Sequence, residues 1–259
     1  MREKNLSLGV WLLPLLPIVL ACVIYLSDLQ TSSFLPINNF TQAVPDAIWA
    51  FLTYLGNGWG VFAIAFPLLL LAPRLLTAGI FAGAISAIAS SVLKPFFDLP
   101  RPAGVLSEGS FHRVGELLLS NAFPSGHTLT AFAIAGALYF ASAKSKRDLL
   151  LWLFILASLV GISRIAIGAH WLTDVLAGAG VGLWCGMLGA KLSQFVQDDR
   201  LLPNTIWPRI IAIGGVVTIY ALLTQTMDLE LNQPIQYASV ALIAVTLVLF
   251  IKAQMPNAS

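Results

Sequence analysis

The sequence predicts an all-α fold, a polytopic bundle of helices that crosses a membrane several times. Of its 259 residues, 58% are hydrophobic and only 10% are charged. A soluble domain is about half apolar and carries about a quarter charged residues. Several apolar runs are also long enough to span a bilayer, which takes about 20 residues of helix. We therefore expect a single integral membrane domain over residues 1–259.

Eight apolar windows have the length of a membrane-spanning helix. They lie at about 8–27, 47–72, 75–93, 125–143, 149–168, 170–190, 207–226 and 234–251. The first window follows Arg2 and Lys4, as the apolar part of a signal peptide would. Its apolar run continues past Cys22 to Leu26, so we expect a retained helix.

Small residues recur at helix-contact spacing in two of these windows. They are Gly79, Gly83, Ser86 and Ser90 in the third window, and Gly178, Gly182 and Gly186 in the sixth. Such faces let two helix backbones approach closely. We expect both windows to be core helices of the bundle, and the alternative is that these faces form a dimer contact.

The distribution of Lys and Arg predicts that both termini are cytoplasmic. Ten of the 14 basic residues lie on the inner side when the N-terminus is placed inside, which satisfies the positive-inside rule. The four outer exceptions are Lys94, Arg101, Arg113 and Arg164. A net charge of +2 without a basic run that alternates with aromatic residues argues against a nucleic-acid partner. Cys22 and Cys185 lie within apolar runs and predict no disulfide framework and no metal site.

A polar stretch between the fifth and sixth windows contains Arg164, His170 and Asp174. Polar and charged groups at membrane depth are costly, so such a cluster predicts a functional site. His170 and Asp174 are four residues apart, and on a helix the carboxylate would hold one nitrogen of the imidazole. The other nitrogen would then be free to act as a nucleophile. The alternative is a buried polar triplet that only tightens helix packing.

Two further clusters are expected at the same membrane surface, because the windows alternate in direction. Lys94 and Arg101 follow the third window, and Ser125, Gly126 and His127 open the fourth. A helix N-terminus favours an anion, and Arg and Lys bind phosphate oxygens. The clusters therefore predict a phosphate site. As alternatives, the two basic residues could extend to lipid head groups, and Ser125 could be a helix cap or a serine nucleophile without the usual Gly-x-Ser-x-Gly context.

The three clusters together resemble the signature of the type 2 phosphatidic acid phosphatase (PAP2) family. The matching motifs are Lys94-(six residues)-Arg101-Pro102, Pro124-Ser125-Gly126-His127, and Ser163-Arg164-(five residues)-His170-(three residues)-Asp174. The resemblance covers about residues 45–190 and implies a six-helix PAP2-like core. Residues 200–259 would add two transmembrane helices, whose role the sequence leaves open.

The resemblance implies a role for each matched residue. His170 would attack phosphorus and form a phosphohistidine, Asp174 would orient it, and His127 would act as acid and then as base. The phosphoryl oxygens would be held by Lys94, Arg101, Ser125, Gly126 and Arg164. No metal or other cofactor is implied. Two histidines that start in different protonation states predict a bell-shaped pH profile.

From this resemblance we expect a lipid phosphate phosphatase in a bacterial inner membrane, with its site facing the periplasm. Its partners would be the bilayer and a lipid phosphate, with undecaprenyl diphosphate favoured over phosphatidylglycerophosphate and phosphatidic acid. One alternative is a phosphotransferase with a lipid or sugar acceptor, and another is a non-enzymatic transporter or lipid-binding protein. The sequence leaves open the oligomeric state and whether His112 and Arg113 read the head group.

Overall fold

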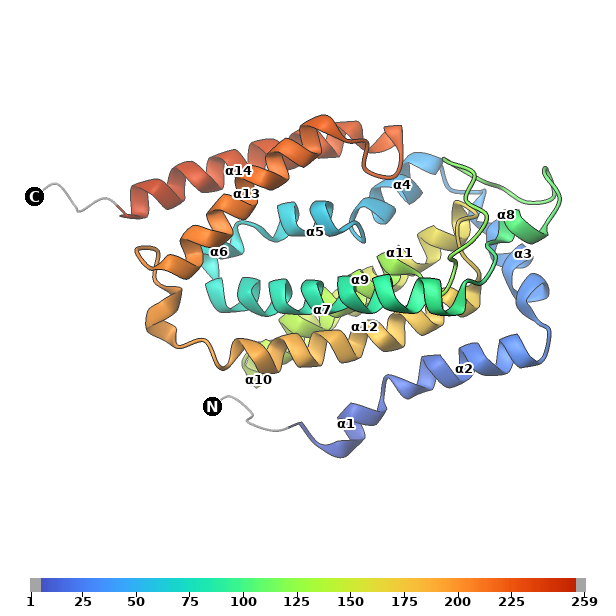
Figure 1. Cartoon of the computed structure of the whole chain (residues 1–259), viewed down its shortest axis with the longest axis horizontal. Helices are drawn as coiled ribbons and strands as arrows, with labels where there is room; N and C mark the ends of the chain where they lie inside the picture. Colours follow the sequence, from blue (N-terminus) through green and yellow to red (C-terminus); the bar gives the residue numbers. More distant parts are fainter. Residues whose placement is uncertain (1–5, 255–259) are drawn as a thin grey trace, which may run out of the picture.

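A computed structural model describes residues 6–254, and every regular element in this range is a helix (Figure 1). The predicted all-α membrane bundle is confirmed. The first part of the chain forms α1 (Leu8–Leu12), α2 (Leu15–Leu26), α3 (Gln30–Thr41), α4 (Asp46–Tyr54), α5 (Gly58–Ala65) and α6 (Leu68–Leu71). The central part forms α7 (Pro73–Phe97), α8 (Pro102–Val105), α9 (Gly126–Ala141), α10 (Lys144–Leu150), α11 (Trp152–Ala166) and α12 (Leu172–Ser193). The last part forms the 3-10 helix η1 (Asp198–Leu201), α13 (Ile206–Thr224), the 3-10 helix η2 (Glu230–Asn232) and α14 (Gln233–Gln254).

The described residues contain six helical segments that are long and apolar enough to cross a membrane, against the eight windows expected. The fourth window is the shorter helix α9, and the second is broken into α4, α5 and α6. The axes of α4 and α5 meet at 74°. Asn57 stabilises this break as the N-cap of α5. Its side chain accepts hydrogen bonds from backbone N–H groups in the first turn of α5, so a new helix starts there.

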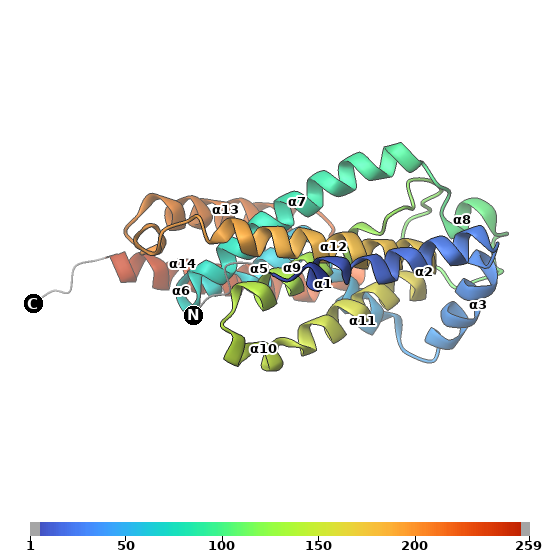
Figure 2. The same ribbon diagram turned by 90° about the horizontal axis from the view of Figure 1, so that it is seen from below.

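Helices α9 and α12 form the centre of the bundle, with α7 and α11 on either side (Figure 2). Three glycines of α12, Gly178, Gly182 and Gly186, face α9 directly. A Cβ atom at Gly182 would overlap the Leu129 carbonyl oxygen, so only glycine permits this approach. The sixth window is therefore a core helix, as expected, and its small face is used within the chain. In α7, Gly83 does not make the expected close contact. A Cβ atom added at Gly83 would have no neighbouring atom within 4 Å.

The C-terminal helices α13 and α14 pack against each other and against α4–α6, away from α12 (Figure 1). Their shared core includes Phe66, Leu222 and Ile243, all fully buried or nearly so. The Tyr54 hydroxyl adds a hydrogen bond of 2.9 Å to Ser239 Oγ. This attachment places the connection between α13 and α14 at the end of the bundle where α8 and the long loop lie.

Candidate active site

The three sequence motifs meet at this end of the bundle. Lys94 lies in the last turn of α7, Arg101 precedes α8, and Ser125 precedes α9. Arg164 is in the last turn of α11, and His170 lies in the turn before α12. The residues predicted to form one site therefore come from four helix ends and one long loop.

The turn between α11 and α12 holds His170 in a fixed place. Gly168 has a φ of 70°, a left-handed conformation that ends α11 and that glycine adopts without strain. The backbone N–H groups of Ala169 and His170 then donate to the Arg164 carbonyl oxygen at 3.0 and 3.1 Å. The His170 side chain is consequently buried, with 1% of the residue exposed.

Asp174 contacts one nitrogen of the His170 ring, as the four-residue spacing predicts. Its Oδ2 atom lies 3.2 Å from His170 Nδ1 and accepts a second hydrogen bond of 2.9 Å from the Trp171 backbone N–H. A carboxylate accepts hydrogen bonds, so Nδ1 carries the proton of a neutral ring. The lone pair of the imidazole is then on Nε2.

Arg101 lies against that second nitrogen. Its Nη1 atom is 3.3 Å from His170 Nε2 and donates a 3.0 Å hydrogen bond to the Ala169 carbonyl oxygen. Its Nε donates to the Ser120 carbonyl oxygen at 2.9 Å. These carbonyl contacts fix the guanidinium where a group bonded to Nε2 would meet it.

The electrostatic environment keeps His170 neutral. Burial lowers its pKa well below the ordinary value, and the positive charges of Arg101, Arg164 and Lys94 lower it further. His127 acts in the same direction. The lowered pKa matches the state that a histidine nucleophile requires, in which the attacking nitrogen has a free lone pair.

The start of α9 offers backbone and side-chain donors. Ser125 is fully buried, makes no capping hydrogen bond with its side chain, and accepts a bond of 3.0 Å from Thr128 Oγ1. The Ser125 hydroxyl therefore does not cap α9. The Lys94 ammonium lies beside Gly126, 3.7 Å from where a Cβ atom would be. Backbone N–H groups at a helix start, next to a cation, form a setting for an anion.

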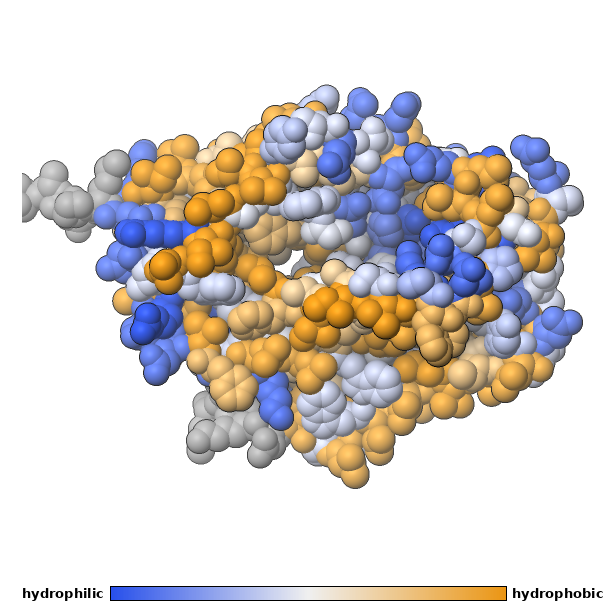
Figure 3. All heavy atoms as spheres, viewed as in Figure 1, coloured by the Kyte–Doolittle hydropathy of each residue, from blue (hydrophilic) through white to orange (hydrophobic). Residues whose placement is uncertain are grey.

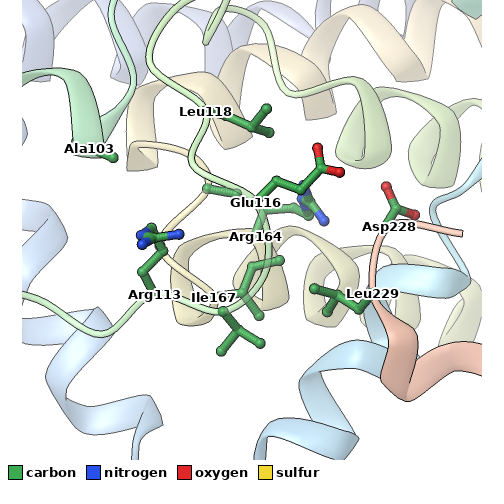
Figure 4. A pocket seen from close by; sticks show the side chains of 11 residues that line it. Ala103, Arg113, Glu116, Leu118, Arg164, Ile167, Asp228 and Leu229 are labelled. Atoms are coloured by element: carbon green, nitrogen blue, oxygen red, sulfur yellow. The ribbon is translucent and has the colours of Figure 1, made fainter. Parts of the chain in front are cut away.

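Arg164 is a buried guanidinium with unused hydrogen-bonding capacity. Its Nε and Nη1 atoms have no hydrogen-bond partner among the residues that the structure describes. The residue lines a cavity of about 90 Å³ together with Arg113, Glu116 and Asp228. In Figure 4, Arg164 and Asp228 point toward each other in this cavity. Unpaired donors on a buried cation favour binding of an anion with several oxygens.

His127 is paired with a residue that the sequence analysis did not single out. Its Nε2 atom lies 3.0 Å from Oδ2 of Asp228, which precedes η2. Burial alone would raise the pKa of Asp228, but the charge and hydrogen bond of His127, together with Arg164 and Asn57, outweigh it and hold the pKa below its ordinary value. Counting windows places residues 227–233 at the same surface as the motifs, but no local pattern indicates which side chain reaches them.

The other polar residues of the long loop have separate partners. His112 Nε2 lies 2.8 Å from Asp46 Oδ1, and its backbone N–H donates to Asn38 Oδ1 at 2.8 Å. His112 thus connects the long loop to α3 and α4 through these two contacts. Arg113 lines the cavity beside Arg164 and donates to the Gly115 carbonyl oxygen. Over residues 6–254 no group of three or more His, Cys, Asp or Glu side chains is arranged to hold a metal ion.

Comparison with known sequences agrees with the signature. A family model for the PAP2 superfamily matches residues 74–198. The lipid A 1-phosphatase of Porphyromonas gingivalis is 40% identical over 80 residues, which is 31% of this chain and 18% of that protein. Phosphatidylglycerophosphatase B of Bacillus subtilis is 32% identical over 120 residues, 43% of this chain and 54% of that protein. The chain thus matches about half the length of one of these relatives and less of the other.

Comparison with solved structures supports the same fold. The crystal structure of Aquifex aeolicus LpxE superposes with a TM-score of 0.52 at 31% sequence identity. The superposition covers 95% of that chain but 63% of this one. More than a third of the present chain therefore lies outside the shared fold.

Proposed function

Because this chain belongs to the PAP2 superfamily, we propose that it is a membrane phosphatase that removes a phosphoryl group from a lipid. The observation that carries the proposal is the setting of His170. Asp174 holds its Nδ1, and Arg101 lies 3.3 Å from its Nε2. A neutral imidazole with a positioned lone pair beside several cations is suited to attack phosphorus.

In the first step, His170 Nε2 forms a bond to phosphorus while the bond from phosphorus to the lipid oxygen breaks. His127, in its charged form, gives a proton to that leaving oxygen, so that a neutral alcohol or a lipid monophosphate departs. In the second step His127 takes a proton from water, whose oxygen attacks phosphorus and displaces His170. The products are inorganic phosphate and the restored pair of histidines.

The phosphoryl oxygens would be held by the surrounding donors. Lys94, Arg101 and Arg164 supply positive charge, and Ser125 with the Gly126 backbone N–H supplies hydrogen bonds. Phosphoryl transfer depends mainly on such positioning and on stabilising charge spread over the oxygens. The unpaired Nε and Nη1 atoms of Arg164 support this assignment, because a phosphate would satisfy them.

A lipid substrate is supported by the apolar surface that leads to the site. Ile88, Val92 and Phe96 lie four residues apart on α7 and are 60–76% exposed. Figure 3 shows hydrophobic residues along α7 and hydrophilic ones gathered at the end with the long loop. A lipid tail could lie against the first surface while its phosphate enters the second.

We further propose the location and the head group. The chain would lie in a bacterial inner membrane with its termini in the cytoplasm and its site at the periplasmic surface. This is supported by the distribution of Lys and Arg. Undecaprenyl diphosphate is the substrate we favour, with phosphatidylglycerophosphate, phosphatidic acid and, from the name of one relative, lipid A as the other candidates.

The test is phosphate release by the purified protein in detergent, across these four lipids. We expect release without any acceptor, insensitivity to chelators and inhibition by vanadate, with no release by His170→Ala. Transfer that needs an added lipid or sugar acceptor would instead indicate a phosphotransferase. Binding of lipid phosphates by wild type without release would indicate a transporter or lipid-binding protein and would contradict the proposal.

A further inference from the structure

The C-terminal helix pair brings a carboxylate to the candidate active site from outside residues 74–198, the range matched by the family model. We propose that Asp228 is a positioning residue for His127, which fixes the ring so that Nε2–H points to Asp228 and Nδ1 faces the substrate. The inference rests on the proposed phosphatase function. It assigns to the α13–α14 connection a role in the chemistry.

The hydrogen bonds around Asn57 determine which groups donate. Asn57 Oδ1 accepts from the backbone N–H groups of Trp59 and Gly60 at 3.0 and 3.3 Å. Its Nδ2 is therefore the end that faces Asp228 Oδ2, at 2.9 Å. The same Oδ2 lies 3.0 Å from His127 Nε2. Because an ionised carboxylate only accepts, His127 must carry a proton on Nε2.

The connection that carries Asp228 is fixed by side chains of its own. Gln236 Nε2 donates to the carbonyl oxygens of Leu222 and Gln225 at 2.9 and 2.8 Å. Asn232 Nδ2 donates to the Met227 carbonyl oxygen at 2.9 Å. The turn between α13 and α14 is thus held on both sides of Asp228, as a residue that positions another must be.

The next residue anchors this connection to the core of the site. Leu229 is 6% exposed and packs in one cluster with Trp49, Leu52 and Ile167. Asp228 itself has a φ of 63°, an uncommon conformation that Asp tolerates better than most residues. The backbone therefore turns so that Leu229 is buried while the Asp228 side chain, 21% exposed, reaches His127.

The charges around His127 show why a carboxylate is needed. Burial opposes a positive charge on the ring most strongly, and Arg164 and Lys94 oppose it further. His170 is close enough to interact with the ring electrostatically. Asp228 favours the positive charge, and Glu116 lines the same cavity. To act as an acid, His127 must be charged when the substrate binds. Asp228 partly offsets the opposing effects, so its carboxylate favours the charged form that the acid role needs.

The kinetic test compares Asp228→Asn with wild type on an alkyl lipid phosphate and on an aryl phosphate such as p-nitrophenyl phosphate. An alkoxide needs a proton to leave, whereas an aryl oxide leaves without one. We expect kcat/KM for the alkyl substrate to fall about 10- to 100-fold and for the aryl substrate to change less than about threefold. The alkaline limb of the alkyl pH profile should move to lower pH by about one unit. Asp228→Glu should restore part of the loss.

Glu230→Gln is the matched control, because it neutralises an exposed carboxylate two residues away. It should behave as wild type in both assays. Equal losses of Asp228→Asn on both substrates, with unchanged pH limbs, would mean that Asp228 has only a structural role. Higher activity with tighter vanadate inhibition would mean that Asp228 occupies the place of the substrate phosphate. Either result overturns the proposal.

A second measurement does not depend on turnover. The chain has 3 histidines, so a protein labelled with ¹⁵N-histidine gives few imidazole signals, and His127→Ala identifies the relevant one. We expect His127 to be protonated on Nε2 in wild type and to gain Nδ1–H tautomer in Asp228→Asn. An unchanged tautomer would contradict the inference. A changed tautomer in a protein that releases no phosphate would contradict the proposed function alone.

Discussion

Arg101 Nη1 lies 3.3 Å from His170 Nε2, the ring nitrogen that Asp174 does not hold. The contact brings together a loop residue and a turn residue, 69 positions apart. It places a fixed cation beside the position that a phosphoryl group bonded to Nε2 would occupy. Three carbonyl oxygens, those of Ala169, Ser120 and Asn121, accept hydrogen bonds from the guanidinium and hold it there.

We expect Arg101→Lys to lower kcat by about 10²–10³-fold. A lysine keeps the charge, but it cannot reach these carbonyl oxygens and Nε2 from one planar group. Phosphate release in detergent measures the effect. Arg209→Lys, on α13 and bonded to Gln254 at 3.2 Å, is the control for loss of an arginine elsewhere. Near-normal turnover of Arg101→Lys would contradict the placement.

Substitution of the two histidines should separate the two chemical steps. With an aryl phosphate as substrate, His127→Ala should form the phosphohistidine but hydrolyse it slowly, because the base for water is missing. The phosphorylated protein should then accumulate, stable to base and labile to acid. With a substrate that carries a radioactive phosphoryl group, His170→Ala should give no labelled protein at all. Label retained in His170→Ala would show that another residue is the nucleophile.

The acid side of the pH profile should lie unusually low. Burial and the nearby cations hold the pKa of His170 well below its ordinary value of 6.5. Only the neutral ring can attack, so activity is present above the lowered pKa and is lost as the pH falls through it. We expect the acid limb of kcat/KM to lie well below pH 6.5. An acid limb at or above pH 6.5 would mean either that the pKa of His170 is not lowered or that His170 is not the nucleophile.

The contact between α9 and α12 should be sensitive to a single methyl group. Gly182→Ala places a Cβ atom against the Leu129 carbonyl oxygen and should destabilise the protein by about 1–3 kcal/mol. Gly83→Ala, where a Cβ atom would meet nothing within 4 Å, should cost no stability. The midpoint of thermal unfolding in detergent compares the two. Equal midpoints would show that the two helices can move apart freely.

Much of the site could be predicted because its determinants are local. The four-residue spacing of His170 and Asp174 sets their contact wherever a helix begins near His170. Ser125 and Gly126 begin α9 because the apolar run starts there, and length and composition alone indicate a membrane bundle. These features depend on residues that are neighbours in the chain, so the amino-acid sequence is enough to predict them.

The pairing of groups that are far apart in the chain depends on how the helices pack. Asp228 and His127 are 101 positions apart, and Asp228 and Asn57 are 171 apart. Their contact depends on the break between α4 and α5 and on how α13 and α14 pack against it. Likewise, the small face of α12 suits a helix neighbour within the chain or in a second copy, and the packing of α9 selects the first. Spacing within a helix fixes which side chains share a face, but the partner of that face is set by the packing of the whole bundle.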